Sequence, residues 1–173
     1  MQDILNLAKK IKLVIFDVDG VLTDGGLFFG DDGQEYKAFY SRDGLGIKLL
    51  QRTGVEVGVI TARQSQLVVH RMDNLGIEHL YQGRLDKITA FTEMLDKLGI
   101  KPEETAYAGD DVIDLPVMKQ VGLAVAVQDA HPFVKKHAHW ITEHNGGRGA
   151  ARDLCELIME AQGTLDEQLN TFM

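Results

Sequence analysis

Short apolar segments rich in β-branched residues alternate with amphipathic stretches along most of the chain, and this alternation restricts the fold more than any other feature. Six apolar segments are predicted strands, at residues 13–16, 55–60, 79–81, 105–108, 123–127 and 140–141. Stretches with helical spacing occupy residues 44–52, 65–75, 87–98, 115–120, 132–136 and 148–162. Strands that alternate with helices predict an α/β fold with a doubly wound parallel sheet.

Composition is consistent with one globular unit. The chain has 173 residues, of which 45% are hydrophobic and 25% charged, and it shows no repeat or linker. We therefore expect a single Rossmann-like domain over residues 1–173. No apolar run approaches the roughly 20 residues that span a bilayer, and residues 1–12 lack the apolar centre of a signal peptide. The single cysteine, Cys155, is expected to be a packed thiol in a cytoplasmic protein.

The formal net charge of -8 argues against broad nucleic-acid binding, which needs a basic surface. It does not exclude a small anionic substrate, because a few local cations and a metal ion can dominate the field in one cleft. We therefore expect neither a nucleic-acid nor a membrane partner.

Residues 26–40 interrupt the alternation with a predicted β-hairpin, inserted after the first strand. The hairpin is unusually aromatic, with Phe28, Phe29 and Tyr36 among its residues. It either folds back on its own core or exposes an apolar patch that pairs with another subunit, and we favour the second interpretation. The polar tail at residues 164–173 is either disordered or docked on a neighbour.

The strand at residues 13–16 ends in Asp17-Val18-Asp19-Gly20, which places two carboxylates on the same side of the chain. Ligands of open α/β sheets bind at the carboxyl ends of the strands. Two adjacent carboxylates repel one another unless a cation lies between them, and a hard cation such as Mg²⁺ prefers oxygen ligands. An ordinary Asp-rich turn is the alternative for this spacing alone.

A second acidic group follows the strand at residues 105–108, where Gly109 precedes Asp110 and Asp111, with Asp114 one turn later. Glycine permits close approach of the backbone. Asp110 and Asp111 are therefore expected to reach the cation held by Asp17.

Two weaker signals complete the set. Thr61 follows the strand at residues 55–60, with Arg63 just beyond, and a hydroxyl with backbone amides at a strand end can hold a phosphate or simply cap a helix. Asp86 is expected to cap a helix, which puts Lys87 in the first turn. A cation is mildly unfavourable there, which favours a functional role somewhat, although a surface lysine is the default interpretation of this signal taken alone.

Taken in order, Asp17-x-Asp19-Gly-Val, Thr61, Lys87 and Gly109-Asp110-Asp111-x-x-Asp114 resemble the haloacid dehalogenase superfamily of phosphotransferases. The resemblance implies that Asp17 is the nucleophile, forming an aspartyl-phosphate, and that Asp19 protonates the leaving alcohol and then deprotonates water. It implies that Mg²⁺ is held by Asp17, Asp110 and the backbone carbonyl of Asp19, with support from Asp111 and Asp114. Thr61 and Lys87 would grip the phosphoryl oxygens.

The segments on either side of Thr61 are too short for a cap domain, so we expect the neighbouring subunit to cover the site through the hairpin and the tail. Strings at residues 17–25, 39–46, 79–83, 129–132 and 146–149 resemble a capless branch of that superfamily. The resemblance implies a homotetramer and hydrolysis of 3-deoxy-D-manno-octulosonate 8-phosphate on the path to lipopolysaccharide. Arg63, Arg71 and Arg148 are the candidate cations for such an acidic substrate, and each is alternatively a surface arginine.

Three other functions remain open at this point. A phosphatase for another acidic sugar phosphate, such as a nonulosonate 9-phosphate, would carry the same motifs. A receiver domain also combines strand-end acids with a threonine and a lysine, but in an order that differs from this chain. A scaffold that has lost catalysis would not be expected to retain Asp17, Asp19, Lys87 and Asp110.

Overall fold

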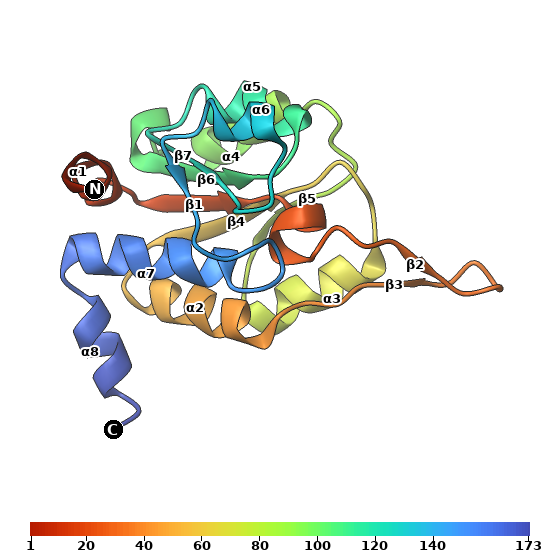
Figure 1. The fold of residues 1–173 in the computed structure, drawn as a ribbon, viewed down its shortest axis with the longest axis horizontal. Helices are drawn as coiled ribbons and strands as arrows, with labels where there is room; N and C mark the ends of the chain where they lie inside the picture. Colours follow the sequence, from red (N-terminus) through yellow and green to blue (C-terminus); the bar gives the residue numbers. More distant parts are fainter.

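The computed structural model describes residues 1–173, and six parallel strands form one sheet in the order β5-β4-β1-β6-β7-β8 (Figure 1). The strands are β1 (Leu13–Phe16), β4 (Glu56–Ile60), β5 (His79–Tyr81), β6 (Thr105–Gly109), β7 (Leu123–Ala126) and β8 (Trp140–Ile141). The predicted doubly wound fold is confirmed, and no strand end differs from the prediction by more than one residue. The chain builds outward from β1 in one direction and then in the other, so the switch point lies beside β1.

Helices cover both faces of the sheet (Figure 1). One face carries α2 (Ser41–Arg52), α3 (Gln66–Leu75) and α7 (Ala150–Gln162), and the other carries α4 (Lys87–Leu98), α5 (Leu115–Met118) and α6 (Pro132–Lys135). Two short helices were not predicted, α1 (Gln2–Ala8) and, in the tail, α8 (Leu165–Asn170), which extends away from the body.

Helix α2 begins at Ser41, three residues before the predicted start, although Gly44 and Gly46 weaken helix propensity. Both glycines are explained by packing. A Cβ atom on Gly44 would lie 2.3 Å from the guanidinium of Arg71, and one on Gly46 would lie 2.5 Å from the side chain of Arg152. Close contacts with neighbouring helices therefore outweigh the local cost of glycine.

The core surrounds β1, whose four residues are all buried. β1 pairs with β4 on one side and β6 on the other, which places the ends of these three strands next to one another. Cys155 is a buried thiol, as predicted, and burial raises its pKa. None of the helices is both long enough and apolar enough to cross a membrane.

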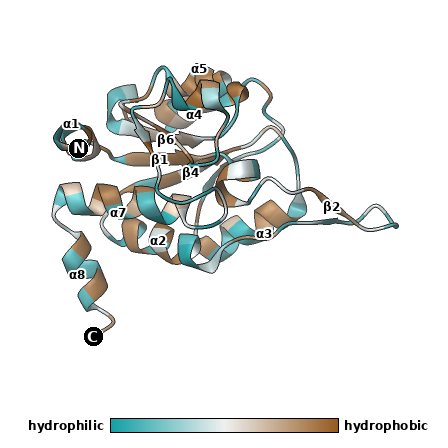
Figure 2. Ribbon diagram, in the orientation of Figure 1, coloured by the Kyte–Doolittle hydropathy of each residue, from teal (hydrophilic) through white to brown (hydrophobic).

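The predicted hairpin is confirmed as an antiparallel pair, β2 (Phe28–Phe29) and β3 (Glu35–Tyr36), that projects from the body (Figure 1). Its aromatic side chains do not fold back on the core: Phe28, Phe29 and Tyr36 are 55%, 60% and 56% exposed. Figure 2 shows β2 as an apolar segment of the thin hairpin, with a hydrophilic turn beyond it. Within this chain, the apolar patch is therefore left uncovered.

Candidate active site

The turn after β1 directs the first pair of carboxylates. Asp17 ends the strand in an extended conformation, and the irregular helical turn of Val18–Leu22 is broken at Asp19 and at Gly20, where φ is +97°. A Cβ atom on Gly20 would lie 2.2 Å from Oδ2 of Asp110. Glycine is required here both for the backbone conformation and for the approach of the second acidic loop.

Lys87 lies against the nucleophile candidate. Its ammonium is 3.0 Å from Oδ1 of Asp17 and 2.7 Å from Oδ1 of Asp114, and its side chain is 1% exposed. It also donates to the hydroxyl of Tyr107 at 3.2 Å. Asp86 caps α4 as predicted, accepting a hydrogen bond from the Ile88 amide at 3.2 Å. The first turn of α4 therefore carries a buried cation whose contacts are with Asp17, Asp114 and Tyr107.

Asp114 organises the second acidic loop. Its Oδ2 accepts from the backbone amides of Asp110 at 3.0 Å and Asp111 at 3.3 Å. Its Oδ1 accepts from Lys87 and, at 2.7 Å, from the hydroxyl of Tyr107. Both oxygens of this fully buried carboxylate are therefore in use.

Burial and mutual repulsion shift the titration of the two acids that face each other. Burial, followed by the charge of Asp114, raises the pKa of Asp17 from 3.8 to about 7, although Lys87 opposes the shift. Burial, together with Asp114 and Asp17, raises the pKa of Asp110 from 3.8 to about 8. Burial disfavours the ammonium of Lys87, but the two carboxylates outweigh it and raise its pKa. The single positive charge of Lys87 therefore does not neutralise the combined negative charge of Asp17, Asp110 and Asp114.

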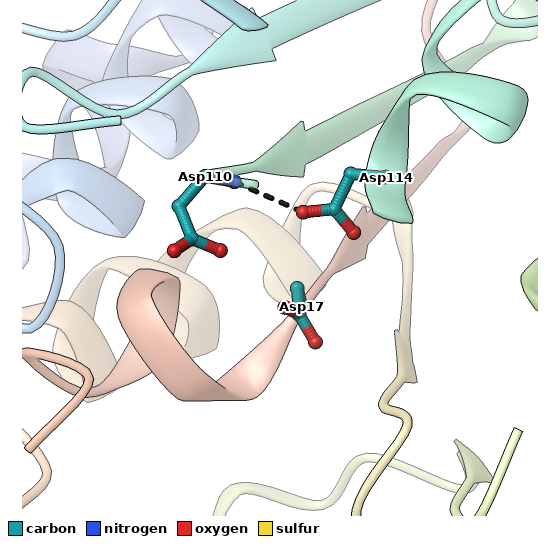
Figure 3. Close-up of side chains that lie close together, drawn as sticks. All are labelled: Asp17, Asp110 and Asp114. Carbon is teal, nitrogen blue, oxygen red and sulfur yellow. Dashed lines mark hydrogen bonds between the residues drawn. The ribbon is translucent and has the colours of Figure 1, made fainter. Parts of the chain in front are cut away.

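These residues fit a divalent cation. Asp17, Asp110 and Asp114 each offer an oxygen, and these three oxygens lie within 4.8 Å of one another. Figure 3 shows the group, with Asp17 at the end of β1 and the other two on the loop after β6. Because Asp114 already accepts from four donors, the carboxylates of Asp17 and Asp110 are the ones with free acceptor capacity. Hard oxygen donors with excess negative charge are what Mg²⁺ prefers.

A cavity of about 190 Å³ opens next to these acids and brings most of the predicted residues together. It is lined by Asp17, Asp19, Thr61, Ala62, Arg63, Asp110, Asp111 and Ile113. Thr61 is fixed at the end of β4 by its backbone, which accepts from Arg84 at 3.1 Å and donates to Tyr81 at 2.9 Å. Asp111 lines the rim and caps the next turn, accepting from the Val112 amide at 2.7 Å.

The three candidate arginines lie in different places. Arg63 lines the cavity. Arg71 lies over the Phe39 ring, 5.7 Å from its centroid, in a separate hollow next to α2. Arg148 is 62% exposed and 3.1 Å from Oδ2 of Asp24. Within one chain, only Arg63 is positioned to meet a ligand in the cavity.

Two charged residues beside the cavity were not predicted as site residues. Lys37, just after β3, forms an ion pair with Asp19, and Glu35 of β3 lies 3.0 Å from Nη2 of Arg63. The available signal was the alternation Glu35-Tyr36-Lys37, because every second strand residue faces the same side.

The glycine-rich loop at residues 146–149 packs on the turn after β1. A Cβ atom on Gly146 would lie 1.8 Å from the carbonyl oxygen of Gly20, and the Gly147 amide donates to the carbonyl of Val21 at 2.8 Å. Gly147 has a φ of +61° and a Cβ there would lie 2.4 Å from the Asp24 amide. These glycines allow two backbones to touch, which fixes the position of the turn after β1.

Comparison with known proteins places this arrangement among phosphatases. The haloacid dehalogenase-like hydrolase family matches residues 76–154. The chain is 52% identical over 165 residues to the 3-deoxy-D-manno-octulosonate 8-phosphate phosphatase KdsC of Escherichia coli K12, covering 95% of this chain and 88% of that protein.

Solved structures agree with the sequence comparison. A crystal structure of the phosphatase of the same name from Yersinia pestis superposes with a TM-score of 0.94 at 50% identity, covering 95% of this chain and 89% of that one. A second crystal structure is that of the phosphatase from Moraxella catarrhalis in complex with a magnesium ion, a phosphate ion and a KDO molecule. It superposes with a TM-score of 0.98 at 41% identity, covering 100% of this chain and 99% of that one.

Proposed function

The chain belongs to the haloacid dehalogenase-like hydrolases, and we propose that residues 1–173 act as one domain that hydrolyses 3-deoxy-D-manno-octulosonate 8-phosphate. The observation that carries this proposal is the buried contact between Asp17 and Lys87 beside a cavity that Asp17 and Asp110 both line. It supplies a nucleophile, a balancing cation and a metal position at one point. The receiver alternative is set aside because the relatives are phosphatases of similar length.

In the first step we assign Asp17 as the nucleophile. One of its carboxylate oxygens attacks phosphorus, the bond from phosphorus to the sugar oxygen breaks, and that oxygen takes a proton from the Asp19 carboxyl. The products are an aspartyl-phosphate, the free sugar and the Asp19 carboxylate. In the second step Asp19 takes a proton from water, whose oxygen attacks phosphorus. The bond between phosphorus and the Asp17 oxygen breaks, which releases inorganic phosphate and restores the Asp17 carboxylate and the Asp19 carboxyl.

Positioning and charge neutralisation supply most of the acceleration of phosphoryl transfer. Lys87 lies 3.0 Å from Asp17 and therefore meets a phosphoryl group bound to it, while Thr61 faces the same cavity. A bound Mg²⁺ would neutralise charge on the phosphoryl oxygens. We assign Asp17, Asp110 and the Asp19 carbonyl to hold it. Asp111 and Asp114 support the loop, since Asp114 has no acceptor capacity left.

The substrate is an acidic sugar phosphate, so a cation beyond the phosphate site is needed for its carboxylate. Arg63 suits this role because it lines the cavity and is 42% exposed on its side chain. Arg71 and Arg148 stay candidates, and they would serve the site only from a neighbouring subunit or after a local rearrangement.

A homotetramer assembled through the hairpin is part of the proposal. The exposed patch of Leu27, Phe28, Phe29 and Tyr36 is unusual for a monomer and supports burial against another copy. Sedimentation velocity tests this proposal. The wild-type protein should sediment as a tetramer, and replacing Phe28 and Phe29 with serine should lower the mass of the assembly. Wild-type protein that sediments as a monomer would contradict the proposal.

A cytoplasmic location is likewise proposed. The lone cysteine is buried and forms no disulfide, which suits a reducing compartment. Fractionation of cells producing the protein, with marker enzymes for each compartment, tests this, and recovery in a membrane or exported fraction would contradict it.

The deciding experiment measures phosphate release from 3-deoxy-D-manno-octulosonate 8-phosphate with Mg²⁺ or EDTA. Wild type should be active only with Mg²⁺, and Asp17→Asn should be inactive. Asp31→Asn, a matched change in the exposed hairpin turn, should retain full activity. Faster turnover of another acidic sugar phosphate, such as a nonulosonate 9-phosphate, would keep the chemistry and change the substrate. Absence of turnover for every phosphate ester would refute the proposed function.

A further inference from the structure

The hairpin brings a buried lysine to the catalytic turn. Lys37 follows β3, yet its side chain is only 1% exposed, in a hairpin whose aromatic residues are more than half exposed. Its ammonium donates to Oδ1 of Asp19 and lies 3.3 Å from Oε1 of Glu35. A hairpin cation is thus in direct contact with the second carboxylate of the active site.

Arg63 closes the contact into a ring of alternating charges. Its Nη2 lies 3.0 Å from Oε1 of Glu35, and its Nε lies 3.9 Å from Oδ2 of Asp19. The ring joins three separate segments: the turn after β1, the hairpin and the loop after β4. Glu35 binds both cations and so holds each at a fixed place relative to Asp19.

Burying a lysine is costly because the ammonium loses water and the side chain loses rotamer freedom. If Lys37 served only to hold the hairpin in place, any nearby acidic residue could be its partner. Its partner is instead Asp19, which lines the cavity. The two oxygens of Asp19 are also treated differently. Oδ1 accepts from Lys37, whereas no hydrogen-bond donor reaches Oδ2.

We propose that Lys37 is a positioning residue for Asp19, with Glu35 fixing Lys37 in turn; this rests on the proposed function. By holding Oδ1, Lys37 restricts rotation of the carboxyl group and directs Oδ2 to the cavity. Oδ2 is then the atom that gives its proton to the leaving sugar oxygen and later takes one from water. The hairpin therefore takes part in proton transfer without touching the phosphate.

The test follows kcat/KM for a series of phenyl phosphates of graded leaving-group basicity, from p-nitrophenyl to unsubstituted phenyl phosphate. A nitrophenolate leaves without a proton, whereas phenolate and sugar alkoxides need one. Lys37→Met should lower kcat/KM for phenyl phosphate and the sugar phosphate by about 30- to 100-fold. For p-nitrophenyl phosphate the loss should stay within about fivefold, so the dependence on basicity steepens.

Three variants sharpen the result. Lys37→Arg should recover part of the activity, because arginine also donates to Oδ1. Glu35→Gln should steepen the dependence in the same direction to a smaller extent. Lys48→Met, an exposed lysine of α2 without an ion pair, should behave as wild type. Retained activity on p-nitrophenyl phosphate shows that Lys37→Met has folded.

Equal losses on all phenyl phosphates would overturn the proposal and indicate a purely structural lysine. A loss confined to the sugar phosphate, with the phenyl series unchanged, would also overturn it and make Lys37 a sugar-binding residue. Wild-type protein that hydrolyses none of these esters would instead refute the proposed function, which is a separate outcome.

Discussion

Replacing Asp110 with asparagine should stabilise the metal-free protein while removing its ability to bind Mg²⁺. No side chain donates a hydrogen bond to the Asp110 carboxylate, which faces the charges of Asp114, Asp17 and Asp111. Asparagine has nearly the same shape but no charge, and its amide can donate to a neighbouring carboxylate. The substitution therefore relieves the repulsion between Asp110 and its neighbouring carboxylates, and it also removes the negative charge that attracts a cation.

The magnitude follows from the pKa of Asp110, which burial and neighbouring charge raise from 3.8 to about 8. One pKa unit corresponds to about 1.4 kcal/mol, so the rise from 3.8 to about 8 sets an upper limit of roughly 6 kcal/mol on the cost of ionised Asp110. Because water reaches part of this carboxylate, we expect Asp110→Asn to raise the free energy of unfolding by about 1–3 kcal/mol at pH 8 in EDTA.

The gain should depend on pH in a defined direction. Between pH 3.8 and about 8 the folded wild type binds a proton at Asp110 that the unfolded chain does not. Wild-type stability therefore falls as pH rises through this window, and the advantage of Asp110→Asn grows from near zero at pH 4 to its full value at pH 8. With Mg²⁺ present the order should reverse, since only wild type gains from binding.

Urea denaturation at several pH values, in EDTA and in Mg²⁺, measures all three effects. Asp31→Asn is the control, because Asp31 is an exposed carboxylate of the hairpin turn outside the acidic cluster. The control should change stability little under any condition. A destabilised Asp110→Asn at pH 8 in EDTA, or a gain that is independent of pH, would refute the electrostatic reasoning.

Three further predictions concern the same cluster. Lys87→Met should lower the free energy of unfolding by about 3–5 kcal/mol in urea titrations, because it leaves buried carboxylates without their cation, and a loss below about 1 kcal/mol would contradict this. Gly20→Ala should reduce kcat at least tenfold, since its Cβ would lie 2.2 Å from Asp110, whereas Gly54→Ala, with a similar φ of +90° and open space, should keep wild-type kcat. The Kd for Mg²⁺ measured by calorimetry should rise as pH falls below about 8, where Asp110 and then Asp17 gain a proton, and a Kd constant between pH 6 and 8.5 would count against it.

Much of the site could be predicted because its parts are local in the sequence and the sheet brings them together. The apolar run before Asp17 fixes a central strand, and Gly109-Asp110 marks the end of another. In a parallel sheet such ends meet at one edge. The pairing of β1 with β6 therefore places Asp17 next to Asp110, as the spacing of motifs predicted.

The rest depends on contacts that no local pattern contains. Lys37 is a charged residue in an exposed hairpin by sequence, and only the fold shows that its ammonium is buried against Asp19. Asp114 was predicted as support for the metal, but one of its four donors, Lys87, lies 27 residues earlier in the chain, whereas the other three come from residues 107–111. Helix α2 was predicted to begin only at Gly44, and the room that this glycine leaves for Arg71 is a feature of tertiary packing.

The alternation of side chains in β3 gives the hairpin two different faces. Glu35 and Lys37 point to the charged ring around Asp19, whereas Tyr36 pairs with Phe28 and both side chains are exposed. An isolated two-stranded hairpin is only marginally stable, so the ion pairs are the main anchor of its inner face in a single chain. Burial of the outer face against a second copy would restrain the same ribbon from the other side. Assembly would then stabilise the position of Lys37, and through it Asp19, although no residue of the aromatic patch touches the cavity.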